Sequence, residues 1–237
     1  MFRSMVLAAL GVALVAGLVL SAVQVFQVSP IIYAAETFEI QQPEVAHTHD
    51  DGHTHDHDAW APADGIERIG YTALSNFLSA FGFALILMAS MFTAKDKAQL
   101  GISWRRGILW GLAGYATVFL IPAIGLTPEI PGMEAAALEG RQSWWILAVL
   151  STGLGFACLT FLPGVRKACA LLFFAAPWLV GAPHPEMHGF AHPDLQALTS
   201  LEALQAQFVY ATAIANAVFW VVLGALAGYA SRWVAKD

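Results

Sequence analysis

A tract of 12 residues, HTHDDGHTHDHD at positions 47–58, holds the densest set of metal-ligating side chains in the sequence. Neutral imidazole binds zinc, copper, nickel, cobalt and iron, and neighbouring carboxylates add negative charge and oxygen ligands. In an extended chain, residues two apart share a face, so the alternating histidines can act on one ion. The predicted ligands here are His47, His49, His53, His55, His57, Asp50, Asp51, Asp56 and Asp58.

Two interpretations of this histidine tract remain open. So many ligands can wrap one cation in many ways, which predicts capture of divalent metals with weak selectivity; the first-row order of affinities places cobalt below nickel and copper. Alternatively the tract is a solvated segment without chemistry, because such assignments are compositional. The acidic segment around it, 29–68, has too few large apolar residues to pack a core, which predicts a mobile external loop.

A second cluster of histidines lies in GAPHPEMHGFAHPD at 181–194, where they recur every four residues. A helix would stack them on one side, but the prolines and the glycine favour a compact turn. The segment 182–207 then holds either a defined metal entry site or a loop with interfacial histidines, and helix formation is expected to resume at Asp194. The predicted ligands are His184, His188, His192 and Glu186.

The elements that position these clusters are membrane helices. Hydrophobic residues make up 58% of the 237 residues and charged residues 12%, with a mean hydropathy of +0.62. About 20 apolar residues cross a bilayer. Five runs qualify, and none contains Asp, Glu, Lys, Arg or His; a sixth is short and contains Pro177. We expect an all-α integral membrane protein, one membrane domain over 1–237, with helices at 5–28, 69–92, 107–126, 144–162, 168–181 (the short run) and 208–229.

Charge decides between five and six crossings, because Lys and Arg accumulate in cytoplasmic loops. If the run at 168–181 crosses and the N-terminus lies inside, nine of the 11 basic residues are cytoplasmic. The same arrangement leaves 15 of the 17 acidic residues and all eight histidines outside. If the run did not cross, 184–202 would become cytoplasmic. We therefore predict a bundle of six transmembrane helices, five being the alternative, with both termini cytoplasmic.

The predicted spans carry no ionisable residue, whereas proton-coupled transporters usually carry Asp, Glu or His at depth. Buried amides are the remaining polar groups, and their carbonyls could line a cation path, although most such amides hold helices together. A divalent cation that moves down an inside-negative potential of about 100 mV gains about 4.6 kcal/mol, which could drive uptake. The candidate pathway residues are Gln24, Gln27, Asn76 and Asn216.

Several classes of function are excluded or disfavoured. The chain has no Gly-x-x-x-x-Gly-Lys-[Ser/Thr] motif and no soluble domain for a nucleotide. Its net charge of −6 argues against nucleic acid as a partner. No nucleophile, base and orienting group can be placed together, so nothing indicates an enzyme, and we expect no permanently bound cofactor.

Other features predict packing. Glycines four residues apart let helix backbones approach closely, and tryptophans at the ends of spans predict anchors at the membrane interface. The cysteines have no close-spaced partner and are interpreted as apolar fillers. These residues are Gly107 with Gly111, Gly224 with Gly228, Trp144, Trp145, Trp178, Cys158 and Cys169.

A resemblance to a known family extends over nearly the whole chain. The segments that carry it, in order, are MFRSMVLAALGVALVAGLVLSAVQVFQVSP, the His/Asp loop with AWAPADGIER, WRRGILWGLAGYATVFLIPAIGLTPEIPGMEAAALEGRQSWW, GAPHPEMHG and IANAVFW. Together they resemble the proposed cobalt transporter subunit family CbtA. This resemblance implies a bacterial inner (plasma) membrane subunit, associated with cobalamin biosynthesis, beside a small histidine-rich membrane partner (CbtB-like). The family is described with five spans, from which the six predicted here depart.

The sequence therefore leads to a hypothesis of metal uptake. External, periplasmic His/Asp loops capture a divalent cation, with cobalt the first candidate and nickel or zinc the alternatives, and a path shared with the partner carries it through the bilayer. The competing hypotheses are a nickel, zinc or cobalt efflux or tolerance component, and a non-transporting metal sensor or assembly protein. External histidines favour uptake, because export needs capture on the inner face.

Overall fold

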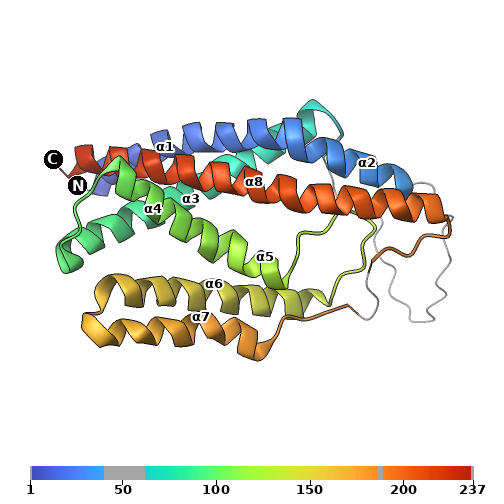
Figure 1. Cartoon of the computed structure of the whole chain (residues 1–237). Coiled ribbons are helices and arrows are strands. Elements are labelled where there is room, and N and C mark those ends of the chain that lie inside the picture. Colours follow the sequence, from blue (N-terminus) through green and yellow to red (C-terminus); the bar gives the residue numbers. More distant parts are fainter. Residues whose placement is uncertain (1, 40–61, 186–188, 236–237) are drawn as a thin grey trace, which may run out of the picture.

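The structure of the chain is a computed structural model that describes residues 2–39, 62–185 and 189–235 (Figure 1). Within these ranges the secondary structure is helical, and the one β contact is an isolated bridge between Met133 and Phe190. In chain order the helices are α1 (Phe2–Val23), η1 (Gln24–Val28), α2 (Ser29–Glu39), α3 (Ile66–Ala98), α4 (Trp104–Tyr115), η2 (Ala116–Leu120), α5 (Ile121–Gly125), α6 (Leu138–Phe161), η3 (Gly164–Ala168), α7 (Cys169–Val180) and α8 (Leu195–Val234).

Five helical stretches of the described chain are long and apolar enough to cross a membrane. Each meets the requirement of about 20 apolar residues for a span. The predicted class, an all-α membrane protein, is confirmed. The stretches are Phe2–Phe38, Ile66–Ala98, Trp104–Gly125, Leu138–Phe161 and Leu195–Val234.

The short run that contains Pro177 forms α7, which runs antiparallel to α6 (Figure 1). Both chain ends lie at one end of the bundle, here called the terminal end, and α8 begins at the opposite, distal end. α7 leads the chain from the terminal end back toward the distal end, so the chain passes along the bundle six times. However, α7 has only 12 residues. At about 1.5 Å per residue it is shorter than a hydrocarbon core, which is roughly 30 Å thick.

Two of the long helices contain a π turn directly before a proline. η1 precedes Pro30 and η2 precedes Pro122, and in both the N–H after the π turn donates to a carbonyl five residues earlier. Proline has no N–H, and its ring clashes with the carbonyl four residues before it, so a wider turn lets the helix continue. The first helix therefore runs through Ser29–Glu39, and the predicted external segment 29–68 is helical at its start.

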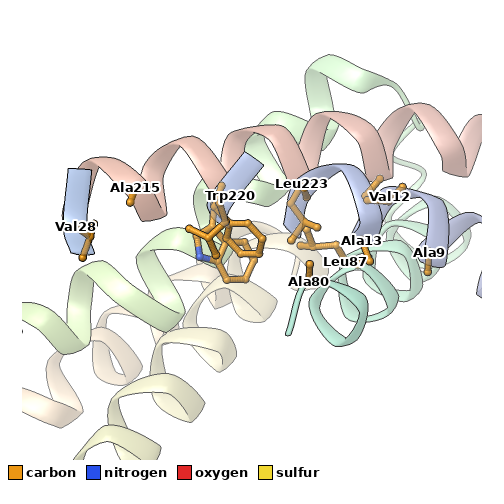
Figure 2. Packing of buried hydrophobic residues seen from close by; sticks show 14 of the residues in the cluster. Ala9, Val12, Ala13, Val28, Ala80, Leu87, Ala215, Trp220 and Leu223 are labelled. Atoms are coloured by element: carbon orange, nitrogen blue, oxygen red, sulfur yellow. The ribbon is translucent and has the colours of Figure 1, made fainter. Parts of the chain in front are cut away.

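Small side chains bring the helices of the core together (Figure 2). Ala9 and Ala13 of α1 and Ala80 of α3 are fully buried, and they pack in one cluster with Trp220 and Leu223 of α8. Lipid tails are as apolar as these side chains, so close van der Waals contact rather than exclusion from water holds such a bundle.

The glycines predicted to allow close approach face one another between α4 and α8. A Cβ on Gly228 would lie 2.8 Å from the Cα of Gly107, and a Cβ on Gly224 would lie 2.8 Å from the Cα of Gly111. The obstacle in each case is backbone, which cannot rotate away as a side chain can. The interpretation of both pairs as a helix-crossing site is confirmed.

Trp144 is buried, and the prediction that it anchors the chain at the membrane interface is wrong. Its side chain is 4% exposed, its Nε1–H donates to the carbonyl of Pro177 at 3.1 Å, and its ring lies against Gly125. Carbonyls in the last turn of a helix lack intrahelical donors, and α7 ends three residues after Pro177. Trp144 thus joins α5, α6 and α7, whereas the neighbouring Trp145 is 41% exposed.

We expect Trp144→Ala to lower the free energy of unfolding by about 3–5 kcal/mol, the range for removing a buried aromatic side chain. The readout is the thermal unfolding of the purified protein in detergent micelles. Trp145→Ala is the matched control and should change the midpoint little. Equal shifts for the two variants would show that Trp144 does not hold the three helices together.

Candidate functional site

Most of the predicted metal ligands lie outside the described residues. These are His47, His49, Asp50, Asp51, His53, His55, Asp56, His57 and Asp58 of the histidine tract, and Glu186 and His188 of the second cluster. In the ranges that the structure describes, no group of three or more His, Cys, Asp or Glu side chains could hold a metal ion. The metal ligands named from the sequence therefore stay predictions.

His184 and His192 are the two predicted ligands within the described ranges. His184 is exposed. The backbone N–H of Asp194 donates to Nδ1 of His192 at 3.1 Å, and the Asp194 carboxylate accepts from Gln196 N at 2.9 Å, which caps α8. Helix formation resumes at Asp194 as predicted. A neutral imidazole that accepts at Nδ1 carries its proton on Nε2, so coordination of a metal through Nε2 would break the contact with Asp194.

The loops at the distal end are joined to each other and to α8. Met133 and Phe190 form the isolated antiparallel bridge, and Glu134 N donates to the carbonyl of Gly189 at 3.2 Å. The side chain of Gln205 accepts from Ile130 N at 3.1 Å and donates to the carbonyl of Pro128 at 2.7 Å. The segment before α8 is therefore tied to the loop between α5 and α6.

Charge is divided between the two ends of the bundle. The end of α3, the start of α4, η3 and the last turn of α8 meet at the terminal end and carry basic residues (Figure 1). The helix ends and loops at the distal end carry mostly acids, and the two arginines there are paired. Arg68 pairs with Glu36 and Asp64, and Arg141 pairs with Glu129 at 3.1 Å.

Two of the four candidate pathway residues meet between the first helix and α3. The Nδ2 group of Asn76 donates to Oε1 of Gln24 at 2.6 Å and to the hydroxyl of Ser21 at 3.0 Å. Asn76 is 9% exposed, and Gln24 opens the π turn η1. The structure does not bring the other two into this group, because Gln27 is exposed on the helix surface and Asn216 donates to Thr212 O within α8 at 2.9 Å.

A cavity of about 200 Å³ extends from this amide pair toward the distal end. Its polar lining comes from Gln24, Ser29, Tyr33, Arg68 and Thr72. The cavity therefore joins the buried amides to a charged mouth.

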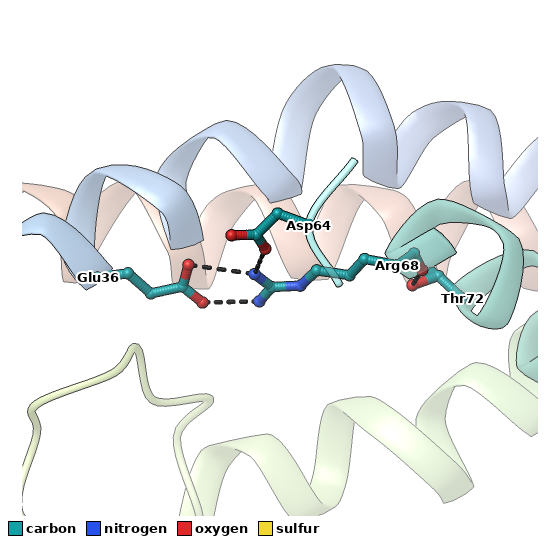
Figure 3. A network of polar contacts seen from close by, with 4 residues as sticks. All are labelled: Glu36, Asp64, Arg68 and Thr72. Atoms are coloured by element: carbon teal, nitrogen blue, oxygen red, sulfur yellow. Dashed lines mark hydrogen bonds and ion pairs between the residues drawn. The ribbon is translucent and has the colours of Figure 1, made fainter. Parts of the chain in front are cut away.

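The mouth of the cavity is an ion-pair network around Arg68 (Figure 3). Nη2 of Arg68 lies 2.6 Å from Oε1 of Glu36, and Nη1 lies 3.1 Å from both Oε2 of Glu36 and Oδ1 of Asp64. The guanidinium also lies over the ring of Tyr33, 4.9 Å from its centroid. Arginine keeps its proton in proteins, so the network can be neutralised only at the carboxylates.

Sequence reasoning did not single out Arg68 or its partners. The signal was present as a four-residue spacing, since Arg68, Thr72 and Asn76 lie on α3 at positions that share one face of a helix. Sequence reasoning also left the cysteines apart, whereas the side chains of Cys158 and Cys169 contact each other where α6 and α7 come together.

Long apolar helices, an acid-rich distal end and a polar cavity between the first helix and α3 define a multi-pass helical membrane protein. Residues 2–232 match the family described as "Probable cobalt transporter subunit (CbtA)", and the chain belongs to that family. The chain is thus a transporter subunit by family. No curated protein and no solved structure matches it.

Proposed function

We propose that this protein is the membrane subunit of a divalent metal uptake system whose cargo is cobalt and which serves cobalamin biosynthesis. The observation that carries the proposal is the match of 2–232 to a family described as a probable cobalt transporter subunit. The cation is transported rather than kept as a cofactor. Nickel and zinc are the competing cargoes, because imidazole and carboxylate ligands accept them as well.

The proposed orientation puts the distal end outside the cell, on the periplasmic face of the inner membrane. Support comes from the basic residues of the terminal end, since Lys and Arg accumulate on the cytoplasmic side. Acids concentrated at one mouth raise the local concentration of cations, an effect that falls with salt. The histidine tract and the second cluster would then collect the metal before it enters the bundle.

A partner subunit is part of this proposal. The family is described as a subunit. The five long helices carry no charged residue at mid-membrane depth that could replace the hydration shell of a divalent ion. We propose a small histidine-rich, CbtB-like membrane protein as the partner, with the route lying between the two chains or beside the Gln24–Asn76 pair.

Uptake is tested by the accumulation of labelled cobalt in cells that express the protein, its partner, both or neither. We expect accumulation above the empty vector when both are present, and cobalt should be displaced by excess nickel more than by excess magnesium. Accumulation equal to the empty vector with both proteins inserted in the membrane would refute uptake. Faster loss of preloaded cobalt would instead indicate efflux.

The two histidine clusters are expected to differ in their concentration dependence. Replacement of the five tract histidines by alanine should weaken cobalt uptake mainly at low metal, because a collector matters most when the ion is scarce. Replacement of His184, His188 and His192 should impair uptake at all concentrations. Thr48→Ala with Thr54→Ala is the control within the tract and should have no effect. Equal, mild losses from both histidine sets would contradict the division between collector and entry site.

A further inference from the structure

We propose that Glu36 and Asp64 form an entry site for divalent cations at the mouth of the cavity, and that Arg68 is a built-in counter-ion which the entering cation displaces. The proposal deepens the proposed uptake function and rests on it for the direction of travel. The site itself follows from the ion-pair network, the cavity beneath it and the amide pair at its inner end (Figure 3).

The position of Nη1 of Arg68 is the position that a metal would take. This atom lies 3.1 Å from an oxygen of each carboxylate, Oε2 of Glu36 and Oδ1 of Asp64. Bonds from a zinc-sized divalent ion to carboxylate oxygens measure about 2.0–2.2 Å, so each oxygen needs to close in by about 1 Å. The Asp64 side chain is 83% exposed and can move by that amount, while Glu36, at 30%, is held more firmly by α2.

The displaced guanidinium has a second place to rest. Arg68 already lies over the ring of Tyr33 at 4.9 Å, a cation–π contact that does not need either carboxylate. A divalent ion meets the two carboxylates with two charges where Arg68 offers one. A monovalent ion has no such advantage, so the counter-ion selects for divalent cations at the mouth.

The cavity provides room for the ion after entry. Its volume is about 200 Å³. A space of this size holds several water molecules, which is enough for an ion that keeps part of its hydration shell. Thr72 and Ser29 line its wall, and Gln24 stands at the inner end in contact with Asn76. Oxygen ligands of this kind hold the ion weakly enough for it to leave again, as conduction requires.

The position of Arg68 is otherwise costly for a cation transporter. An unpaired arginine at the acid-rich end would repel the cargo, and Arg68 is the only basic side chain among the described residues that line this cavity. Pairing with two acids leaves the three groups with a net charge of −1 when empty. The mouth therefore attracts cations without exposing two bare carboxylates to each other.

The test measures Co²⁺ binding to the purified full-length chain in detergent by equilibrium dialysis, with the five tract histidines replaced by alanine to remove their background. Arg68→Gln should tighten Co²⁺ binding at least tenfold and should let Na⁺ compete. Glu36→Gln should weaken it at least tenfold, and Asp64→Asn several-fold. Arg141→Gln is the matched control, because Arg141 forms the other Arg–Glu pair of the distal end away from this cavity.

Each outcome decides the proposal. Unchanged or weaker binding in Arg68→Gln, with wild-type helicity by circular dichroism, would show that the ion pair only straps α2 to α3. If Arg68→Gln does not fold, Asp64→Asn decides, because it leaves the Arg68–Glu36 pair intact; binding equal to that of the parent chain would overturn the site. Binding that follows the predicted pattern in a protein whose cells accumulate no cobalt would refute uptake and leave the site standing.

Discussion

Gly224→Val is expected to prevent the bundle from packing, with a loss of at least about 3 kcal/mol, the upper part of the range for an overpacked core. The added side chain would meet the backbone of α4 at Gly107 and Gly111, where a Cβ alone already comes to 2.8 Å from the Cα of Gly111. Since neither backbone can yield without separating the helices, α4 must move away from α8. The measurement is the yield of monodisperse protein and its thermal midpoint in detergent.

The matched control for this prediction is Gly82→Val on α3. Nothing lies within 4 Å of a Cβ built at Gly82, so the same substitution adds β-branching in a helix without overpacking. It should lower the midpoint only slightly. A midpoint for Gly224→Val within the error of the Gly82→Val control would mean that α4 and α8 are not in backbone contact in the membrane.

Asn76→Leu is expected to reduce cobalt uptake at least tenfold while the protein still folds. The substitution keeps the side-chain volume but removes the donor that Gln24 and Ser21 accept from. Hydrogen bonds between membrane helices average only about 0.6 kcal/mol, so the structural loss is small. A cation that passes the inner end of the cavity would lose an oxygen ligand, and a loss of that kind appears in transport rather than in stability.

Asn216→Leu separates this effect from the general removal of a buried amide. Asn216 donates to a carbonyl of its own helix and lies away from the cavity lining. Its replacement should leave uptake within about twofold of wild type, since it removes a hydrogen bond of similar size. If both variants lose uptake in proportion to their loss of thermal stability, Asn76 is a packing residue and the cavity is not on the route.

The helices of this protein could be read from the sequence because hydropathy is a local property. Runs of about 20 apolar residues are long enough to cross a bilayer wherever the rest of the chain lies. The glycine pairs could be predicted for a similar reason, since four-residue spacing on a helix places both glycines on one face. Which faces meet is a different matter, and the crossing of α4 with α8 needed the tertiary structure.

Proline and tryptophan misled sequence reasoning because their effect depends on their surroundings. Pro30 looked like the end of the first helix, but a π turn can accommodate a proline, and the helix continues through η1 to Glu39. Trp144 looked like an interfacial anchor, but the carbonyl of Pro177 offers its indole N–H a buried acceptor. Neither partner can be inferred from the residues adjacent in the chain.

The sequence by itself determined the class of the protein, its apolar helices and the family to which it belongs, because these follow from composition and from the order of residues along the chain. Only the tertiary structure decided which polar groups act together. It joined Glu36, Asp64 and Arg68 at one mouth and brought Asn76 to Gln24, residues 52 positions apart. The physical reason is that a membrane helix buries few polar groups, and their partners are set by which helix faces pack together rather than by spacing along the chain.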